Sequence, residues 1–236
     1  MFRGTKVAAI VPAYNEIQTA FGIVYRLLWH PKVNEVIFVD DGSNDGTYEK
    51  IVSILETNIG VLKSLKIIKL EKNSGKTAAI QAGFEKTETP FILLLDADLK
   101  ELKAEHIDTL VDPVLRDEVD MTIGLFRGGR FITDLAHRTN PNLSGQRAMR
   151  RECLEKVNWQ KIKDFGLESH LTDLVRRYNW KIKWVELHGM THRMKTEKRG
   201  FWQGWKARLK MWRQIIFYDW LRETGWSRVF KQRKKE

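Results

Sequence analysis

Short apolar runs alternate with longer helical segments through about the first 100 residues of this 236-residue chain. Each run has the length and the β-branched or aliphatic content of a strand. The runs read KVAAIV, EVIFVDD, LKIIKL and PFILLLDAD, and they start near Lys6, Glu35, Leu65 and Pro90. Segments 15–29, 44–55 and 75–86 have helical periodicity. This alternation predicts an α/β fold, with a mixed, mostly parallel sheet flanked by helices and ligands at the carboxyl ends of the strands.

The pattern is less regular beyond Leu110. DMTIGLF and IKWVEL read as strands, and residues 167–178 read as a helix. Between them, residues 142–157 read as a loop followed by a helix, in which Cys153 lies near the helix start.

Residues 193–236 are strongly basic, with 14 Lys and Arg against 4 Asp and Glu, and they carry most of the formal net charge of +11. Large apolar side chains recur there at intervals of three and four, which predicts one stripe of an amphipathic helix. The stripe comprises Trp202, Trp205, Leu209, Trp212, Ile216 and Trp220, and four basic residues fall largely outside it: Lys206, Arg208, Lys210 and Arg213. We therefore predict an α/β domain in residues 1–192 and a basic, Trp-rich amphipathic helical segment in residues 193–236.

This C-terminal segment admits two interpretations. A basic helix with a Trp stripe can lie in a membrane interface, where each Lys or Arg adds on the order of 1 kcal/mol against anionic lipid. Alternatively, the stripe packs on the α/β domain or forms a contact in a homodimer, with its charges in solvent. Nucleic acid is a less favoured anionic partner, and salt-dependent binding of DNA would reveal it.

Composition also limits where the chain can act. No run approaches the roughly 18 apolar residues that would span a bilayer, and the N-terminal stretch lacks the features of a secretory signal. The single cysteine excludes a disulfide within one chain. We therefore expect a cytoplasmic protein, which is peripheral at the inner face of the membrane if the C-terminal segment binds lipid.

Asp96 and Asp98 provide the strongest chemical signal. They follow a buried apolar strand, where two carboxylates are costly unless a cation lies between them. Carboxylate oxygens suit Mg²⁺ or Mn²⁺, and these ions also bind diphosphates. Taken alone, a solvated turn explains the Asp-Ala-Asp sequence equally well.

Polar residues follow the other early strands as well. Asp41 can accept hydrogen bonds from a ribose or a base, and Gly42 allows close backbone approach, although a capped turn is the alternative. The segment VPAYNE ends the first strand, where a simple helix cap is the alternative. NSGKT is not a P-loop, because Leu70 occupies the place of the first glycine. Lys76, after Gly75, fits better as a diphosphate contact at a helix N-terminus.

Together these motifs resemble glycosyltransferase family 2, whose members have the GT-A fold. VPAYNE, VDDGSNDGT, the Gly75–Lys76 turn and LLDAD occur in the family's order and approximate spacing. The resemblance implies a hexosyltransferase that uses a UDP- or GDP-sugar, with Asp98 as a metal ligand. It also implies that the nucleotide sugar is held by Pro12, Ala13, Tyr14, Glu16, Asp41, Lys76 and Asp96.

The second half resembles two subgroups, the polyprenyl-phosphate sugar synthases and the glucosyl-3-phosphoglycerate synthases. LSGQRAMRREC is similar to the acceptor-side loop of both, which implies acceptor binding by Ser144, Gln146 and Arg147. GGRFITDLA, FGLES and THR look more like the phosphoglycerate type, which implies that His192 is a metal ligand. A surface histidine is the alternative for His192. Family 2 implies inversion at the sugar carbon, whereas the phosphoglycerate type implies retention.

The implied chemistry needs positive charge near the leaving nucleoside diphosphate, which the metal on Asp98 and the ammonium of Lys76 would supply. A phosphate monoester acceptor has a second pKa of about 6 and needs no strong base. A hydroxyl acceptor needs a carboxylate, for which Glu168 in the first turn of a helix is the candidate. Interaction with the helix dipole is the alternative role for Glu168.

Arginines are dense around the segments assigned to the acceptor. Guanidinium groups match phosphate geometry, so Arg127, Arg130, Arg147 and Arg150 predict an anionic, phosphorylated acceptor resembling 3-phosphoglycerate or a polyprenyl phosphate. Surface solubility alone could explain two of these four.

Two rival functions remain. Sugar nucleotidylyltransferases need a Gly-rich, Arg-containing loop after the first strand, which VPAYNE lacks. A nucleotide- or membrane-binding module without transferase activity would have no need to keep Asp41, Lys76, Asp96 and Asp98 together.

Overall fold

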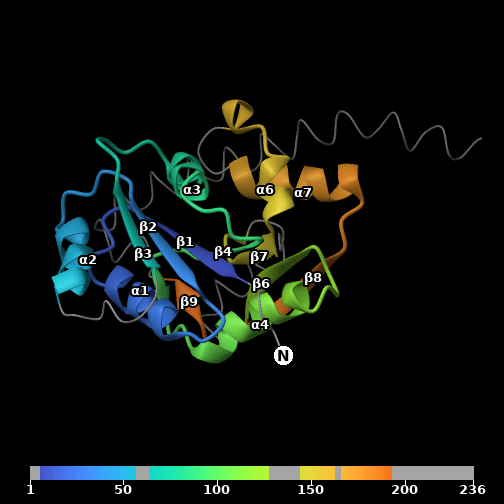
Figure 1. Ribbon diagram of the computed structural model, residues 1–236, viewed down its shortest axis with the longest axis horizontal. Coiled ribbons are helices and arrows are strands. Elements are labelled where there is room, and N and C mark those ends of the chain that lie inside the picture. The colour runs from blue at the N-terminus through green and yellow to red at the C-terminus, as the bar shows by residue number, and fades with distance from the viewer. Residues whose placement is uncertain (1–5, 57–63, 128–143, 163–165, 193–236) are drawn as a thin grey trace, which may run out of the picture. The chain divides into compact units, whose positions relative to one another are not determined.

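The computed structural model describes residues 6–56, 64–127, 144–162 and 166–192. Within these ranges the largest element is a seven-stranded sheet made of β1 (Val7–Ala13), β2 (Glu35–Asp40), β3 (Ser64–Lys69), β4 (Phe91–Leu94), β6 (Met121–Arg127), β7 (Arg147–Arg150) and β8 (Ile182–His188). The strand order is β3-β2-β1-β4-β7-β6-β8 (Figure 1). In this sheet β7 is antiparallel to both of its neighbours, and the other pairs are parallel. The predicted mixed, mostly parallel sheet is therefore confirmed.

Helices cover both faces of the sheet. They are α1 (Ala20–Trp29), α2 (Thr47–Glu56), α3 (Lys76–Phe84), α4 (Ala104–Leu115), α6 (Arg151–Glu155) and α7 (Gly166–Tyr178), with a short 3-10 helix at Trp159–Lys161. Successive side chains of a strand point to opposite faces, so β1 contributes to two cores. Val7, Ala9 and Val11 pack in the core that contains residues of α1, α2 and α4, whereas Ala8 and Ile10 pack with α3, α6 and α7.

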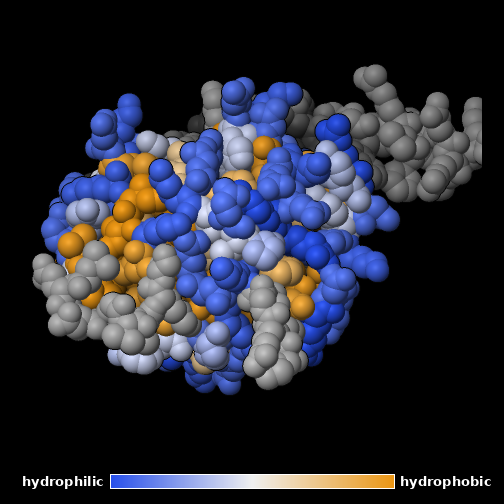
Figure 2. All heavy atoms as spheres, in the orientation of Figure 1, coloured by the Kyte–Doolittle hydropathy of each residue, from blue (hydrophilic) through white to orange (hydrophobic). Residues whose placement is uncertain are grey.

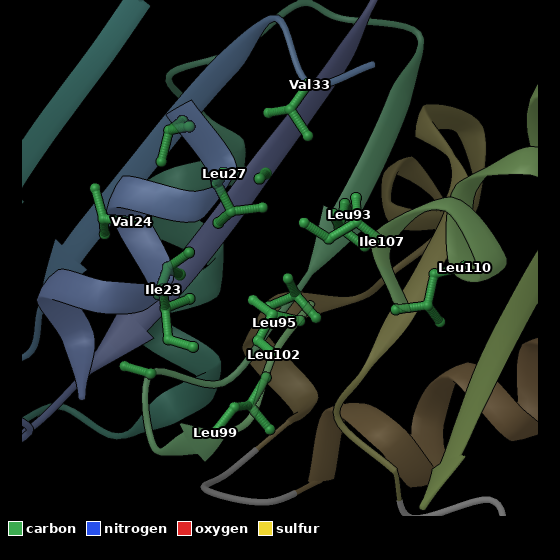
Figure 3. Packing of buried hydrophobic residues seen from close by; sticks show 14 of the residues in the cluster. Ile23, Val24, Leu27, Val33, Leu93, Leu95, Leu99, Leu102, Ile107 and Leu110 are labelled. Atoms are coloured by element: carbon green, nitrogen blue, oxygen red, sulfur yellow. The ribbon is translucent and has the colours of Figure 1, made fainter. Parts of the chain in front are cut away.

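The first of these cores fixes the helix layer against the middle of the sheet. In Figure 3, Ile23 and Leu27 of α1 lie beside the sheet, and Leu93 and Ile107 lie close to each other between β4 and α4. These side chains are at most 4% exposed. Burial of each such aliphatic side chain contributes about 1.5–3 kcal/mol, so this packing holds α1 and α4 against the sheet.

Two predicted helices begin later than expected. The sequence places a helix over 15–29, but α1 starts at Ala20. Asn15 has a φ of 56°, in the left-handed region that a helix cannot contain, so the chain turns before α1 begins. Likewise α2 starts at Thr47 rather than at residue 44, because Asp45 accepts a hydrogen bond from the Thr47 backbone N–H within the preceding turn.

Beyond β4, the structure contains elements that the sequence analysis missed. Residues 147–150 form the strand β7, where a loop before a helix was expected. The helix α4 was also missed, as were β5 (Leu99–Lys100) and β9 (Thr191–His192), which pair in a small antiparallel sheet. Cys153 does lie near the start of a helix, α6, as predicted.

The surface of the described residues is mainly hydrophilic in the view of Figure 2, with apolar side chains gathered over α2 and β3. In the edge strand β3, Lys66 and Lys69 add charge that opposes pairing with another chain. No described helix is long and apolar enough to cross a membrane. The compact unit that contains the sheet ends at His192. The predicted helical segment 193–236 lies outside the described residues and stays a prediction.

Candidate active site

The carboxyl ends of β1, β2 and β4 lie side by side. Ala13 of β1 pairs with Asp40 of β2, and Ile10 of β1 pairs with Leu94 of β4. Residues that follow these strands therefore meet at one edge of the sheet, as parallel strands require. Asp41 and Asp96 both lie in this position.

Lys76 connects three elements at this edge. It is the first residue of α3, and its Nζ lies 2.7 Å from Asp96 Oδ1, which follows β4. The same Nζ lies 2.8 Å from Oε1 of Glu168, in the first turn of α7. A cation thus lies between two carboxylates that come from separate parts of the sequence.

The buried ionisable groups Lys76 and Glu168 each shift the pKa of the other. Burial alone would lower the pKa of Lys76, but Asp96 and Glu168 outweigh it, so the pKa lies above its ordinary value. Burial alone would raise the pKa of Glu168, but Lys76 and then Arg147 outweigh it, and the pKa lies below its ordinary value. Both groups are therefore charged at neutral pH.

The loop before β7 packs directly on this ion pair. Gln146 is fully buried, and its Nε2 donates to Asp96 Oδ2 at 3.1 Å. A Cβ at Gly145 would collide with Lys76 Nζ and would lie 2.9 Å from Asp96 Oδ2. Ser144 is buried and accepts a hydrogen bond from the backbone N–H of Gln146 at 3.3 Å. A larger residue at Gly145 would therefore displace the side chains of Lys76 and Asp96.

Arg147 was predicted to contact an acceptor, but its guanidinium is fully buried and bonded to the protein. Its Nε donates to the carbonyl of Ser144 at 2.9 Å and its Nη2 to the carbonyl of Glu168 at 3.3 Å, while Nη1 lies 3.5 Å from Met121 Sδ. Burial lowers the pKa of Arg147 to about 10. This geometry favours a structural role, in which Arg147 ties the start of α7 to the loop before β7.

Asp41 is 3% exposed and uses both carboxylate oxygens within the protein. Oδ1 accepts the backbone N–H of Ser74 at 2.7 Å, and Oδ2 accepts that of Gly75 at 2.9 Å. Burial raises the pKa of Asp41 above its ordinary value, although these hydrogen bonds lower it. Asp41 therefore holds the segment that leads into α3.

The end of β1 is tied to the loop after β2. The backbone N–H of Asn15 donates to Ser43 Oγ at 2.9 Å, and that of Glu16 donates to Thr47 Oγ1 at 2.9 Å. Pro12, Ala13 and Glu16 are buried and Tyr14 is partly buried. The VPAYNE and VDDGSNDGT motifs thus form one contiguous region.

Asp98 and His192 are brought together by the small sheet. In its register Leu99 of β5 lies opposite His192 of β9, so the backbone of residue 192 is next to that of the residue after Asp98. The two residues predicted to share a metal are therefore neighbours in space, although 94 positions apart. Within the described residues, no group of three or more His, Cys, Asp or Glu side chains is arranged to hold a metal ion.

The predicted arginine cluster is only partly assembled. Arg127 ends β6 and forms an ion pair with Glu186, at 3.0 Å between Nε and Oε1. Arg130 lies outside the described residues. Arg150 pairs in register with Phe91 at the start of β4 and forms ion pairs with Asp117 and Asp120. Because β7 is antiparallel, it carries Arg150 to the opposite edge of the sheet from Asp41 and Asp96, which favours the solubility interpretation for this arginine.

Two contributors to the site escaped the sequence analysis. Gly145 was quoted within LSGQRAMRREC and Ser74 within NSGKT, but neither residue was given a role. A glycine flanked by polar residues just before a strand is a signal for close backbone approach, and it could have identified Gly145. Ser74 acts through its backbone N–H, so the identity of its side chain gives no sign of this role.

Comparison with known proteins agrees with this geometry. The sequence profile of Glycosyl transferase family 2 matches residues 8–182. The chain therefore belongs to glycosyltransferase family 2, and its sheet and flanking helices have the GT-A fold predicted from the motifs.

Curated relatives include enzymes named for polyprenyl phosphates. The chain is 32% identical to the dodecaprenyl-phosphate galacturonate synthase of Rhizobium johnstonii over 50% of this chain and 35% of that protein. It is 26% identical to the dolichyl-phosphate beta-glucosyltransferase of Saccharomyces cerevisiae over 69% of this chain and 51% of that protein. The chain thus spans between about a third and a half of the length of these relatives.

Among solved structures, the fold is similar to a glucosyl-3-phosphoglycerate synthase from Mycobacterium tuberculosis. The TM-score is 0.64 at 25% identity, over 80% of this chain and 72% of that one. That structure is a complex with Mn²⁺, UDP-glucose and phosphoglyceric acid. Both subgroups that the sequence of the second half resembles are therefore present among the similar proteins.

Proposed function

We propose that the chain is a metal-dependent glycosyltransferase that moves a sugar from a UDP- or GDP-sugar to an anionic, phosphorylated acceptor. The observation that carries this proposal is Lys76, held between Asp96 and Glu168 at the carboxyl edge of the sheet. An ammonium fixed by two carboxylates has a defined position, and it can replace one of these contacts with a diphosphate oxygen. A membrane-binding module without a nucleotide site would have no need of such an arrangement.

Two residues, Asp98 and His192, would contribute ligands to a divalent metal whose remaining ligands come from water and the diphosphate. Asp98 offers a hard carboxylate ligand. His192 of β9 pairs with Leu99 of β5, the residue that follows Asp98. Mg²⁺ or Mn²⁺ accepts such ligands together with water and phosphate oxygens. When bound, the ion would neutralise charge on the leaving diphosphate. Solved family-like structures with Mn²⁺ or with Mg²⁺ support the same class of cofactor.

Glu168 bears on the nature of the acceptor. A carboxylate whose pKa lies below its ordinary value, and which is ion-paired with Lys76, is a weak proton acceptor at neutral pH. A phosphate monoester, with its second pKa of about 6, is already ionised and needs no strong base. The geometry of Glu168 therefore favours a phosphate acceptor over a hydroxyl acceptor, in agreement with the curated relatives that are named for polyprenyl phosphates.

The two sets of similar proteins point to different acceptors. The curated relatives are named for polyprenyl phosphates, whereas the solved structure contains a small phosphorylated acid. Arg127 at the end of β6 is available to either acceptor once its pairing with Glu186 is exchanged. The basic, Trp-rich segment 193–236 favours the polyprenyl phosphate, because a membrane-linked acceptor and a membrane-binding helix would act at the same surface. We propose this as the first acceptor to test.

The test is nucleotide release from UDP- and GDP-sugars with Mn²⁺ or Mg²⁺, with a short polyprenyl phosphate or 3-phosphoglycerate as acceptor. We expect metal-dependent release that Asp98→Ala reduces at least 100-fold. Glu88→Ala is the matched control. Glu88 precedes β4 and its side chain is 90% exposed, so this variant should retain full activity. Absence of release with every donor, with equal nucleotide binding by wild type and Asp98→Ala, would reject the transferase in favour of a binding module.

A further inference from the structure

Both carboxylate oxygens of Asp41 accept hydrogen bonds from the backbone that leads into α3. We propose that Asp41 is a positioning residue that fixes segment 70–75 and thereby places Lys76 against the donor diphosphate. This inference rests on the proposed function, in which Lys76 is the residue that contacts the diphosphate.

The first support is the hydrogen bonding of the carboxylate. Its two oxygens each accept one backbone N–H, from Ser74 at 2.7 Å and from Gly75 at 2.9 Å. Hydrogen bonds from a backbone amide to an ionised carboxylate are short and about twice as strong as neutral ones. Two such bonds to consecutive residues fix both the place and the orientation of the peptide that precedes α3.

The second support is the close contact between the end of β2 and the same segment. A Cβ at Gly42 would lie 2.7 Å from the carbonyl carbon of Lys72 and 2.8 Å from the nitrogen of Asn73. The backbone N–H of Leu70 donates to the carbonyl of Asp40 at 2.8 Å. The segment is therefore held against β2 along its length, and Asp41 makes the last contacts before the helix.

The third support is the position of Lys76 directly after this segment. Gly75 has a φ of 93°, a conformation that other residues rarely adopt, and Lys76 is the next residue and the first of α3. From this position the side chain reaches Asp96 and Glu168. A change in the Gly75 peptide would therefore be transmitted to the ammonium of Lys76.

Nucleoside recognition and Lys76 positioning predict different binding defects. A carboxylate that reads the base or ribose contributes equally to the affinity for a nucleoside monophosphate and a nucleoside diphosphate. A carboxylate that positions Lys76 contributes only to the additional affinity that the second phosphate provides. The ratio of the two dissociation constants therefore separates the two roles.

The experiment measures binding of UDP and UMP to the full chain by calorimetry with Mn²⁺, with GDP and GMP as a second pair. Lys76→Met defines how much of the ratio between the two dissociation constants depends on the ammonium. Asp41→Asn keeps the size of the side chain but replaces one acceptor with a donor. Gly75→Ala disturbs the same peptide and leaves the Asp41 carboxylate intact, so it tests the proposal independently if Asp41→Asn does not fold.

We expect Asp41→Asn and Gly75→Ala each to weaken UDP binding about tenfold and UMP binding less than twofold. In the double variant of Asp41→Asn with Lys76→Met, the ratio of the UDP and UMP dissociation constants should be the same as in Lys76→Met alone, because both changes act through one contact. Equal weakening of UMP and UDP by Asp41→Asn, or additive losses in the double variant, would overturn the positioning role. If instead Lys76→Met leaves the ratio unchanged, the diphosphate contact in the proposed function fails, and the positioning role fails with it.

Discussion

Lys76 Nζ lies 2.8 Å from Glu168 Oε1, although the two residues are 92 positions apart in the sequence. Glu168 is 6% exposed, so its charge depends on the partners that surround it. The contact joins α3 to α7 and therefore the first half of the domain to the second. The contact makes the stability of the protein depend on pH, and the direction of that dependence can be worked out.

Replacing Lys76 with Met should reverse the contribution of Glu168 to the pH dependence of stability. In the wild type the pKa of Glu168 is lowered, so its stabilisation is present above the ordinary value of 4.5 and is lost as pH falls through the lowered value. Without the ammonium, burial and the nearby Asp96 should raise this pKa. The variant should therefore become relatively more stable as pH falls from 8 to 5.

Urea unfolding of both proteins at pH 8 and pH 5 measures this effect. Removing one partner from a buried pair costs up to about 3–5 kcal/mol, and we expect about 2–3 kcal/mol at pH 8 because Arg147 remains. The deficit should shrink at pH 5. Lys69→Met is the control, since Lys69 and Glu49 are both exposed and solvent screens their ion pair, so this change should alter stability little at either pH. A deficit that does not change with pH would contradict the prediction.

Gly145→Ala should disrupt the site without breaking the fold. The added methyl group would meet Lys76 Nζ and the Asp96 carboxylate, and the ammonium would have to move away. Overpacking of this kind costs about 1–3 kcal/mol, and we expect UDP affinity to fall about tenfold. Gly22→Ala in α1 has nothing within 4 Å of its new methyl group and should instead stabilise by about 0.5–1 kcal/mol. Similar UDP affinities for the two variants would contradict the proposed contact.

The sequence was sufficient for the parallel half of the sheet because β1, β2 and β4 are runs of aliphatic residues with polar residues directly after them. Strand ends and site residues were therefore predicted together. The start of α1 was not predicted correctly, because helical periodicity extends back through a turn in which Asn15 adopts a left-handed conformation. The spacing of apolar residues does not reveal such a turn.

The antiparallel half was harder to predict for a different reason. RAMR in β7 has charged ends and no β-branched residue, so its strand character comes from pairing with β4 and β6. Once β7 is a strand, Arg147 and Arg150 lie at opposite ends of it and cannot both face one ligand. The contact between Lys76 and Glu168 likewise depends on tertiary packing: each residue was assigned to the site from its place at the start of a helix, but neither local pattern pairs the two.

Cys153 should be unreactive in the native protein. Burial raises the pKa of its thiol to about 12, so the thiolate fraction at pH 8 is roughly 1000-fold lower than for an ordinary cysteine. Labelling with a chromogenic disulfide reagent should therefore be slow in buffer and complete within minutes in urea. Complete labelling within minutes in buffer would show that the thiol is accessible.

The basic segment offers a test of the membrane interpretation that does not depend on activity. If segment 193–236 binds lipid, the full chain should sediment with vesicles of phosphatidylglycerol and phosphatidylcholine, and less so as salt increases. Changing Lys206, Arg208, Lys210 and Arg213 to Gln should weaken this binding at least tenfold, because each charge contributes on the order of 1 kcal/mol. Nucleotide affinity should be unchanged, since the described site contains none of these residues.

The matched control removes the same amount of charge from the α/β domain, by changing four exposed lysines to Gln: Lys86, Lys156, Lys181 and Lys183. If net charge alone drives association, both variants lose vesicle binding equally. If the C-terminal segment is the contact, only the first variant does. Absence of vesicle binding by the wild type would reject the membrane interpretation and leave packing of the Trp stripe within the protein or in a dimer, because a buried stripe has no apolar face to offer to lipid.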